Sequence, residues 1–130
     1  MKLGYTIIYV KDVTATVEFF EHAFGLKRRF IHEAGDYAEM ETGDTALTFA
    51  LEDAAADNDI AVYPNRAREL PAAWEVCLVT DDVDSAYKKA VQNGAKPILS
   101  PTQKPWGQVV SYVRDLNGCL VELASPVAPQ

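Results

Sequence analysis

The feature that most constrains the fold of this chain is an internal repeat with an offset of 70 residues. The dipeptide Asp12-Val13 recurs as Asp82-Val83, and Gly25 lies close to Gly94 in the same register. Aspartate favours the N-cap of a helix and glycine its C-terminal end, so each copy predicts one capped helix. A repeat of this kind indicates two structural units that share one architecture.

Runs of β-branched and aromatic residues surround each expected helix and predict strands. The helices are expected at 13–24 and 83–93. The strands are expected at 4–10, 26–32, 37–41 and 46–51 in the first half, and at 75–80, 97–99, 108–113 and 119–124 in the second. Each half is therefore a βαβββ module, and the fold class is α+β. Two curved mixed sheets would each bury one face on a helix and enclose a shared cavity with the other.

The domain organisation follows from the same pattern. The first module is expected at residues 1–52 and the second at 73–126, and together they form one domain. Residues 53–72 show no clear period and are interpreted as a long connection. A connection of this length inside a compact domain is usually functional or a linker between units.

Composition excludes two classes of partner. The 130-residue chain has a net charge of −7, and its basic residues do not cluster beyond Lys27-Arg28-Arg29. Nucleic acid is therefore not an expected partner, because the phosphate backbone requires a basic face. The apolar runs are too short for a membrane span, and the sequence from Met1 shows no export signal. A cytoplasmic location is expected.

The cysteines and histidines offer no recognisable motif. Cys77 and Cys119 both lie in apolar strand patterns and are expected to be buried free thiols in a reducing cytosol. His22 falls on a helix and His32 at a strand end, and both are expected to be exposed. Two cysteines and two scattered histidines cannot form a zinc cluster.

Two carboxylates in apolar strands are the candidate functional groups. Glu122 lies in the last strand, and Glu75 begins the strand after the connection. An unpartnered carboxylate is costly to bury, and alternation places Glu122 on the face opposite Val121 and Leu123. Two close carboxylates raise one another's pKa and can serve as general acid and base, or they can clamp a cation. The alternatives are that Glu122 points to bulk solvent, or that the pair hydrogen-bonds only to Tyr5 and water.

Several local patterns together resemble the vicinal oxygen chelate superfamily, which includes glyoxalase I, bleomycin-resistance proteins and extradiol dioxygenases. The resemblance covers nearly the whole chain as paired βαβββ modules. The patterns are Asp12-Val13 with Phe19-Phe20 and Phe24-Gly25-Leu26, Asp82-Val83 with Gly94-Ala95, Trp106-Gly107-Gln108, Tyr112-Val113-Arg114-Asp115-Leu116-Asn117-Gly118, and Leu120-Val121-Glu122-Leu123. Leu116 departs from the family, which often has proline there.

The resemblance implies where a metal would be held and also disfavours most metal chemistry. The family's metal ligands, usually histidines and glutamates, fall on Tyr5, Thr48, Glu75 and Glu122. Only Glu122 keeps the usual ligand type. An extradiol dioxygenase is not expected, since its iron requires two histidines and one carboxylate. A weakly bound divalent cation such as magnesium or manganese, held by Glu75 and Glu122, remains open.

Three functions remain in competition. In the first, the protein resembles bleomycin-resistance proteins and sequesters a cationic or aromatic compound, such as an antibiotic, in an acidic, aromatic cavity. In the second, Glu75 and Glu122 are the catalytic residues of a lactoylglutathione-lyase-like lyase or isomerase. In the third, the chain is a structural interaction module.

The expected ligand contacts come from both halves of the chain. Tyr5 and Tyr9 share one face of the first strand, and Trp106 lies in a loop where it would contact either a ligand or another subunit. Trp74 is expected in the core. The full set of expected ligand-binding residues is Tyr5, Tyr9, Thr48, Glu75, Trp106 and Glu122. The resemblance also implies a homodimer, because short two-module chains of this family commonly pair.

Overall fold

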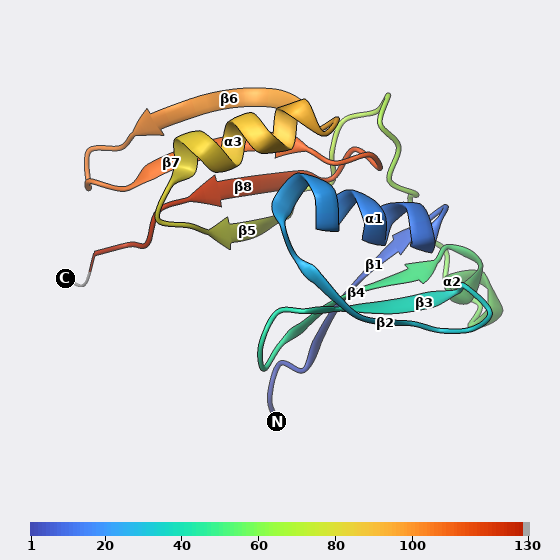
Figure 1. The fold of residues 1–130 in the computed structure, drawn as a ribbon. Coiled ribbons are helices and arrows are strands. Elements are labelled where there is room, and N and C mark those ends of the chain that lie inside the picture. Colours follow the sequence, from blue (N-terminus) through green and yellow to red (C-terminus); the bar gives the residue numbers. More distant parts are fainter. Residues whose placement is uncertain (129–130) are drawn as a thin grey trace. The chain divides into compact units, whose positions relative to one another are not determined.

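The structure is a computed structural model that describes residues 1–128. The chain divides into two compact units, the first from Met1 to Asn65 and the second from Arg66 onward. This division falls inside the expected connection, 53–72. Each unit has its own sheet and its own helix on one face of that sheet (Figure 1).

The first unit is a four-stranded mixed sheet of order β1-β4-β3-β2. Strands β1 and β4 are parallel, and the other neighbours are antiparallel. Its elements are β1 (Tyr5–Val10), α1 (Val13–Phe24), β2 (Lys27–Ile31), β3 (Tyr37–Glu41), β4 (Ala46–Leu51) and α2 (Asp53–Asp57).

The second unit repeats this sheet with the order β5-β8-β7-β6. Strands β5 and β8 are parallel, and the other neighbours are antiparallel. Its elements are β5 (Glu75–Val79), α3 (Val83–Gln92), β6 (Lys96–Gln103), β7 (Val109–Arg114) and β8 (Leu120–Ala124). The prediction of an α+β fold built from two βαβββ units is confirmed, whereas the enclosed cavity stays a prediction. Within residues 1–128 no helix has the length and hydropathy of a transmembrane span.

Both helices begin where the repeat places an aspartate. Asp12 accepts a hydrogen bond from the backbone N–H of Ala15 at 3.0 Å, and Asp82 accepts one from Ser85 at 3.1 Å. Gly25 ends α1 in the left-handed conformation at φ 69°, where its N–H donates to the carbonyl of Glu21. These contacts satisfy backbone groups that a helix end leaves without partners.

Alternation along the strands separates a helix-facing surface from an open one. In β1, Ile8 and Val10 are only 2% exposed, whereas Tyr5 is 58% exposed. The helix contributes Phe20, whose ring lies 5.0 Å from that of Phe49 in β4. In the first sheet the face that carries Tyr5 is therefore the open one, and the face that carries Ile8, Val10 and Phe49 is covered by the helix.

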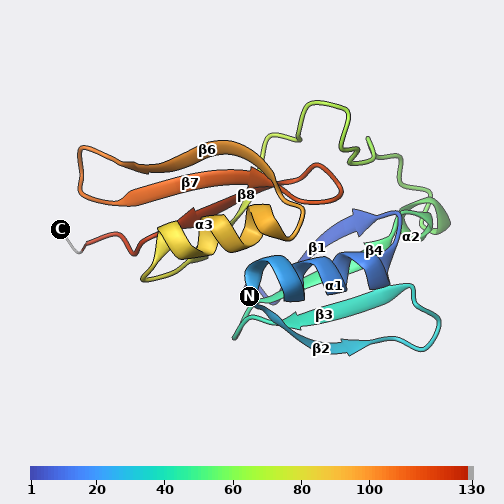
Figure 2. The ribbon, with the colours of Figure 1, turned by 45° about the horizontal axis from the view of Figure 1, so that its top comes forward.

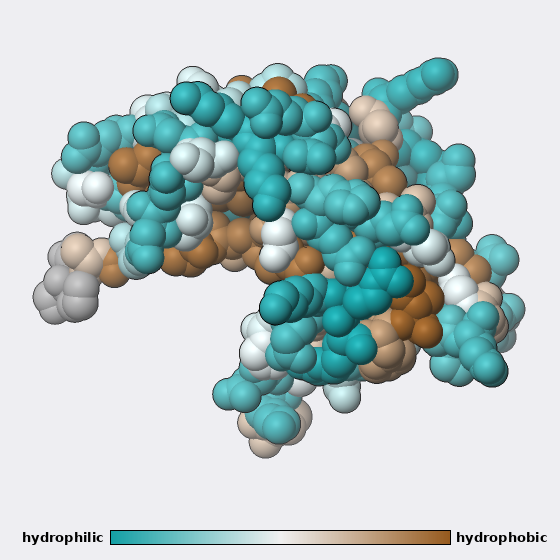
Figure 3. Space-filling model, in the orientation of Figure 1, coloured by the Kyte–Doolittle hydropathy of each residue, from teal (hydrophilic) through white to brown (hydrophobic). Residues whose placement is uncertain are grey.

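In the second unit the apolar side chains also face the helix. Val113, Val121 and Leu123 are at most 3% exposed, and α3 adds Val83 and Ala90 to this core. Tyr112 and Glu122 alternate with these residues and are half-buried on the other face. Hydrophobic surface also follows the β5 edge in Figure 3, where Val79 is 63% exposed.

Three local predictions need correction. The expected connection contains the short helix α2, before a segment without helix or strand that leads to β5 (Figure 2). Trp74 is 38% exposed rather than in the core, because it precedes β5 and lies outside the strand's alternation. Cys77 is exposed, while Cys119 is buried as predicted. Cys77 lies on an edge strand, so sheet neighbours flank it on one side only.

The turn between β7 and β8 holds the start of the second unit. Arg114 is 7% exposed; its Nε donates to the carbonyl of Gly118 at 2.8 Å, and Nη2 donates to the carbonyls of Arg66 and Glu69. Gly118 has φ +86°, and a Cβ there would lie 2.5 Å from the carbonyl oxygen of Arg66. We call this contact of Arg114 and Gly118 with residues 66–69 the clasp.

Candidate functional site

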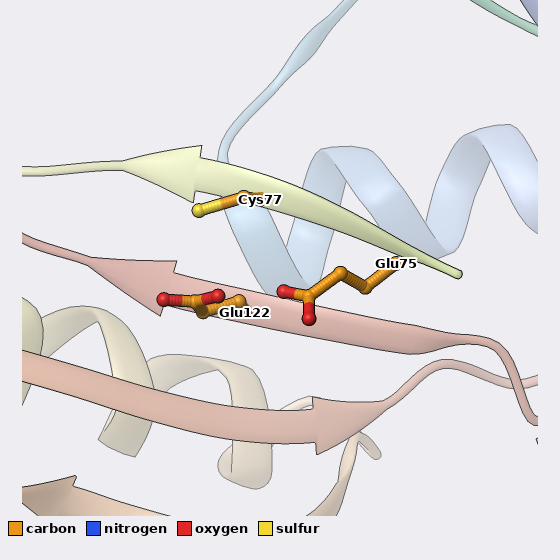
Figure 4. Close-up of side chains that lie close together, drawn as sticks. All are labelled: Glu75, Cys77 and Glu122. Atoms are coloured by element: carbon orange, nitrogen blue, oxygen red, sulfur yellow. The ribbon is translucent and has the colours of Figure 1, made fainter. Parts of the chain in front are cut away.

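The two predicted carboxylates lie together on the open face of the second sheet. Parallel pairing of β5 and β8 sets Cys77 opposite Glu122, and Glu75 lies two residues before Cys77 on the same face. Figure 4 shows the carboxyl groups of Glu75 and Glu122 and the thiol of Cys77 on one side of these strands. One donor atom from each of the three side chains lies within 4.8 Å of the other two.

Tyr112 completes this cluster from the next strand. Strand β7 pairs with β8 so that Tyr112 lies opposite Glu122, and its hydroxyl donates a hydrogen bond to Oε1 of Glu122 at 3.0 Å. The tight turn before β8 fixes that register, because it pairs Arg114 with Leu120. We call Glu75, Cys77, Tyr112 and Glu122 the acidic cluster.

The carboxyl of Glu75 has a pKa near neutrality. Although the side chain is exposed to solvent, its partial desolvation on the sheet, followed by hydrogen bonding to Glu122 and the negative charge of Glu122, raises the pKa of Glu75 to about 7. The ion pairs Arg28–Glu21, Arg29–Glu39, Arg29–Glu41 and His32–Asp36 all lie in the first unit, and within residues 1–128 no ion pair involves Glu75 or Glu122. The cluster therefore has a negative charge without a cationic side chain beside it.

The other two members keep their protons at neutral pH. Although Cys77 is exposed to solvent, partial desolvation of its thiol by the surrounding sheet, followed by the charge of Glu122, raises the pKa of that thiol to about 11. Burial, followed by the hydrogen bond to Glu122, raises the pKa of Tyr112 to about 12. A protonated thiol and a protonated phenol thus face the carboxyl pair as hydrogen-bond donors.

The residues predicted in the first unit occupy different environments. Thr48 is fully buried, and its hydroxyl donates to the carbonyl of Thr6 at 3.2 Å. Tyr5 is exposed and Tyr9 half-buried on the open face of that sheet. Their roles as ligand contacts stay predictions.

Glu39 is a first-unit carboxylate that the sequence did not single out. It is 9% exposed, accepts a hydrogen bond from the Tyr37 hydroxyl at 2.8 Å and pairs with Arg29 at 3.2 Å. The register of β3 and β4 sets it opposite Thr48. The two sheets therefore differ in charge, because Arg29 neutralises the carboxylate of the first and no such arginine accompanies that of the second.

Trp106 lies outside the acidic cluster. Its ring is 55% exposed in the turn between β6 and β7, and its indole N–H donates to Oε1 of Gln108 at 2.9 Å. Val109 begins β7 and Tyr112 follows three residues later, so the turn is roughly 10 Å or more from Tyr112 at about 3.3 Å per residue.

The donor set of the cluster does not fit the metal centre that the resemblance implies. Both histidines, His22 and His32, lie in the first unit and are exposed. Zinc and nickel prefer nitrogen and sulfur donors, and an iron triad requires two imidazoles. Here the only nitrogen or sulfur donor is Cys77, a thiol whose pKa is about 11 and which would have to lose its proton first.

Comparison with known proteins gives the family. A model of the Glyoxalase/Bleomycin resistance protein/Dioxygenase superfamily matches residues 2–123. The chain belongs to this superfamily. That membership confirms the resemblance found in the sequence, and the paired βαβββ units are the fold that the superfamily shares.

Relatives of this superfamily member align along almost its whole length. It is 28% identical over 125 residues to the uncharacterized protein YwbC of Bacillus subtilis, covering 93% of this chain and 94% of the relative. It is 24% identical over 124 residues to the uncharacterized protein YraH of the same organism, covering 95% and 97%.

Solved structures share the fold at lower identity. A glyoxalase-related enzyme from Fulvimarina pelagi has a TM-score of 0.82 at 18% identity, covering 97% of this chain and 88% of that one. A glyoxalase/bleomycin resistance protein/dioxygenase family enzyme from Burkholderia phytofirmans PsJN has a TM-score of 0.77 at 19% identity, covering 98% and 100%. These likenesses show the architecture.

Proposed function

We propose that this superfamily member binds a small cationic molecule at the acidic cluster. The observation that supports this proposal is the pair Glu75–Glu122, two adjacent carboxyls without a basic side chain paired to either among residues 1–128. Near neutral pH, a proton on Glu75 limits the repulsion between the two carboxyls. A bound ammonium or guanidinium group would take the place of that proton. The cation would gain charge-assisted hydrogen bonds, which are roughly twice as strong as neutral ones.

The proposal extends to the character of the whole ligand. An aromatic cation, such as a cationic antibiotic, is the class of ligand that we propose, because Tyr112 of the acidic cluster offers it an aromatic ring beside the carboxyls. Binding without turnover, as in resistance by sequestration, is the expected mode. A cytoplasmic homodimer is the assembly that we propose for it.

Fluorescence titration with two probes tests this proposal. Ethidium is a planar aromatic cation, and anilinonaphthalene sulfonate is an aromatic anion. We expect ethidium to bind stoichiometrically, and Glu122→Gln and Glu75→Gln each to weaken its binding by about tenfold, because each removes one carboxyl group whose negative charge attracts the cation. Bleomycin, a compound in the superfamily's description, competes with ethidium if it occupies the same face.

Glu33→Gln is the matched control, because Glu33 is an exposed carboxylate in a turn of the first unit. It should leave ethidium binding unchanged. Equal binding of both probes, or ethidium binding that survives both cluster variants, would contradict the proposal.

A second candidate function follows from the pKa of Glu75. A carboxyl with a pKa of about 7 beside a second carboxyl suits general acid–base catalysis at neutral pH. Glu122 would remove a proton from a carbon next to a carbonyl, and Glu75 would give its proton to the carbonyl oxygen. Glu122 would then give its proton to the former carbonyl carbon, and Glu75 would remove the hydroxyl proton from the neighbouring carbon, which yields the isomer.

The hemithioacetal of methylglyoxal and glutathione is the substrate that tests this isomerisation, followed by the absorbance of the thioester product. The assay is run with and without added magnesium or manganese. We expect Glu122→Gln to abolish turnover in a chain whose circular dichroism is unchanged. An active, folded Glu122→Gln variant would eliminate this second candidate.

A further inference from the structure

The open face of the first sheet holds a cation of its own. The guanidinium of Arg29 forms a fork with the carboxylate of Glu41, in which Nε donates at 2.9 Å and Nη2 at 3.1 Å. Nη1 donates to Oε1 of Glu39 at 3.2 Å, and Nη2 also donates to the carbonyl of Gly43 at 3.3 Å. A fork of this kind fixes the orientation of a guanidinium as well as its position. Arg29 is therefore held against both carboxylates.

The strand register places these carboxylates on the open face. Glu39 pairs with Thr48 in β4, and Thr48 pairs with Ile7 in β1. Paired residues point to the same side of a sheet, and Ile7 lies two residues after Tyr5, so Glu39 shares the face of Tyr5. Glu41 lies two residues after Glu39 in β3 and points the same way. The two carboxylates thus lie on the face that the helix leaves open.

The open faces of the two sheets share one arrangement, a carboxylate that accepts a hydrogen bond from a phenol. Glu39 accepts one from the Tyr37 hydroxyl at 2.8 Å, and Glu122 accepts one from the Tyr112 hydroxyl at 3.0 Å. The faces differ in their cation, since Arg29 pairs with Glu39 at 3.2 Å while no ion pair within residues 1–128 involves Glu122. The first sheet therefore supplies from within the chain the positive charge that the second sheet lacks.

We propose that Arg29 restricts the proposed cation binding to the second unit, because its guanidinium occupies the position on the first open face that the cation of a ligand would otherwise take. Glu39 is only 9% exposed, and Arg29 provides the positive charge that compensates its carboxylate. Removing one partner of such a pair leaves the other charge uncompensated and costly. A cation that then reaches this face would gain the attraction that Arg29 had. The inference rests on the proposed function, since it explains why ethidium is expected at one unit and not at both.

The first open face also offers aromatic rings to such a cation. Tyr9 and Tyr37 both pair with Ala50, so their rings lie on the same side of the sheet, to either side of β4. Tyr5 is exposed on this face, and the other two tyrosines are half-buried. Aromatic rings attract cations to their faces. An aromatic cation is therefore a suitable probe of the first sheet as well as of the second.

Titration of the full chain with ethidium, followed by calorimetry and by fluorescence, gives the number of ligands bound per chain. The wild type is expected to bind about one equivalent and Arg29→Gln about two, because the first open face then has a carboxylate without its cation. Arg29→Lys keeps a positive charge on this face and should bind no more than the wild type. Arg29→Gln combined with Glu39→Gln should also lose the added equivalent.

Arg28→Gln is the matched control, because it removes the same charge from the neighbouring residue on the other face of the sheet. Arg28 pairs with Met40, which is fully buried in the core, and its guanidinium forms a fork with Glu21 of α1 at 2.9 and 2.8 Å. Arg28→Gln should therefore keep the wild-type stoichiometry. An added equivalent of ethidium in this variant would overturn the inference, since net charge alone would then set the number of ligands.

The fold of each variant is checked by circular dichroism. Arg29→Met keeps the long unbranched stem of the arginine, and it provides the same test if Arg29→Gln does not fold. Ethidium binding to the wild type, with no added equivalent in either variant, would overturn the inference and leave the proposed function standing. Ethidium binding to Arg29→Gln but not to the wild type would overturn the proposed function alone, and binding to neither chain would overturn both.

Discussion

The raised pKa of Glu75 predicts that the proposed cation binding depends on pH. Its carboxyl, with a pKa of about 7, keeps a proton in mildly acidic solution, so a bound cation there must displace it. We expect ethidium affinity to rise from about pH 6 to about pH 8, with close to one proton released per ligand at the acidic end. Calorimetry in buffers of different ionisation enthalpy measures this release, and a flat affinity profile would contradict the expectation.

The same carboxyl should reduce stability at alkaline pH. The pKa of Glu75 is raised from 4.5 to about 7, so the folded state binds the proton more tightly than the unfolded state does. Stability from this group is therefore complete below about pH 4.5 and lost as pH rises through about 7. Glu75→Gln should raise the melting temperature at about pH 8 and change it less at about pH 5.

The contribution of Glu41 to stability should have the opposite pH dependence, so Glu41→Gln serves as the comparison. The Arg29 hydrogen bond lowers the pKa of Glu41, so its contribution is present above the unfolded pKa and lost in acid. The pair is exposed, and its effect on melting temperature should be small. An equal effect of Glu75→Gln at both pH values would show that the carboxyl does not titrate between them.

At the level of single residues, the sequence predicted the carboxylates but not their surroundings. Alternation and the cost of burial drew attention to Glu75 and Glu122 without any knowledge of register. Tyr112 depends on the pairing of β7 with β8, although the short turn before β8 was a signal that could have predicted it. Cys77 was two residues from Glu75 on the same face, and the apolar strand pattern led to the wrong expectation that it was buried.

Substitution of Asp12 tests how much the N-cap stabilises the first helix. Asp12→Ala removes the acceptor of the Ala15 N–H and should lower the free energy of unfolding by about 1 kcal/mol. Asp12→Asn retains a capping oxygen and is the matched control. Urea denaturation followed by circular dichroism measures both variants, and equal losses would show that the charge rather than the capping hydrogen bond matters.

Elements with a clear period were predicted more accurately than those without one. The helix at 13–24 and the strands at 37–41 and 46–51 have the observed bounds. Strand β6 extends from Lys96 to Gln103, well beyond the expected 97–99, because an edge strand tolerates its two prolines. The alanine-rich helix α2 is a single short turn whose sequence has no second turn to reveal a helical period.

At the scale of the whole molecule, the clasp is the contact that we expect to stabilise the second unit. Gly118→Ala would place a Cβ 2.5 Å from a backbone oxygen of Arg66, which cannot move as a side chain can. We expect Gly118→Ala to lower the free energy of unfolding by more than about 1 kcal/mol, which is the cost of the strained backbone conformation alone. Gly107→Ala is the control, because Gly107 has φ +95° and open space around it.

The chain as a whole should not depend on a transition metal. Elemental analysis of gently purified protein is expected to find no stoichiometric zinc, nickel or iron, since the acidic cluster has no imidazole. Dialysis against EDTA should leave ethidium binding and the melting temperature unchanged. Bound metal at close to one equivalent, lost together with ligand binding on dialysis, would contradict this.

Alkylation of the exposed thiol inside the acidic cluster can report whether a compound covers this face of the sheet. Cys77 and Cys119 are its two free thiols, and only Cys77 is exposed. Iodoacetamide reacts with the thiolate, so raising the pH towards the Cys77 pKa of about 11 should speed its alkylation while buried Cys119 stays protected. Any compound that covers this face would slow the gain of one carbamidomethyl mass, so a chemical library could be screened by intact-mass footprinting before the natural ligand has been identified.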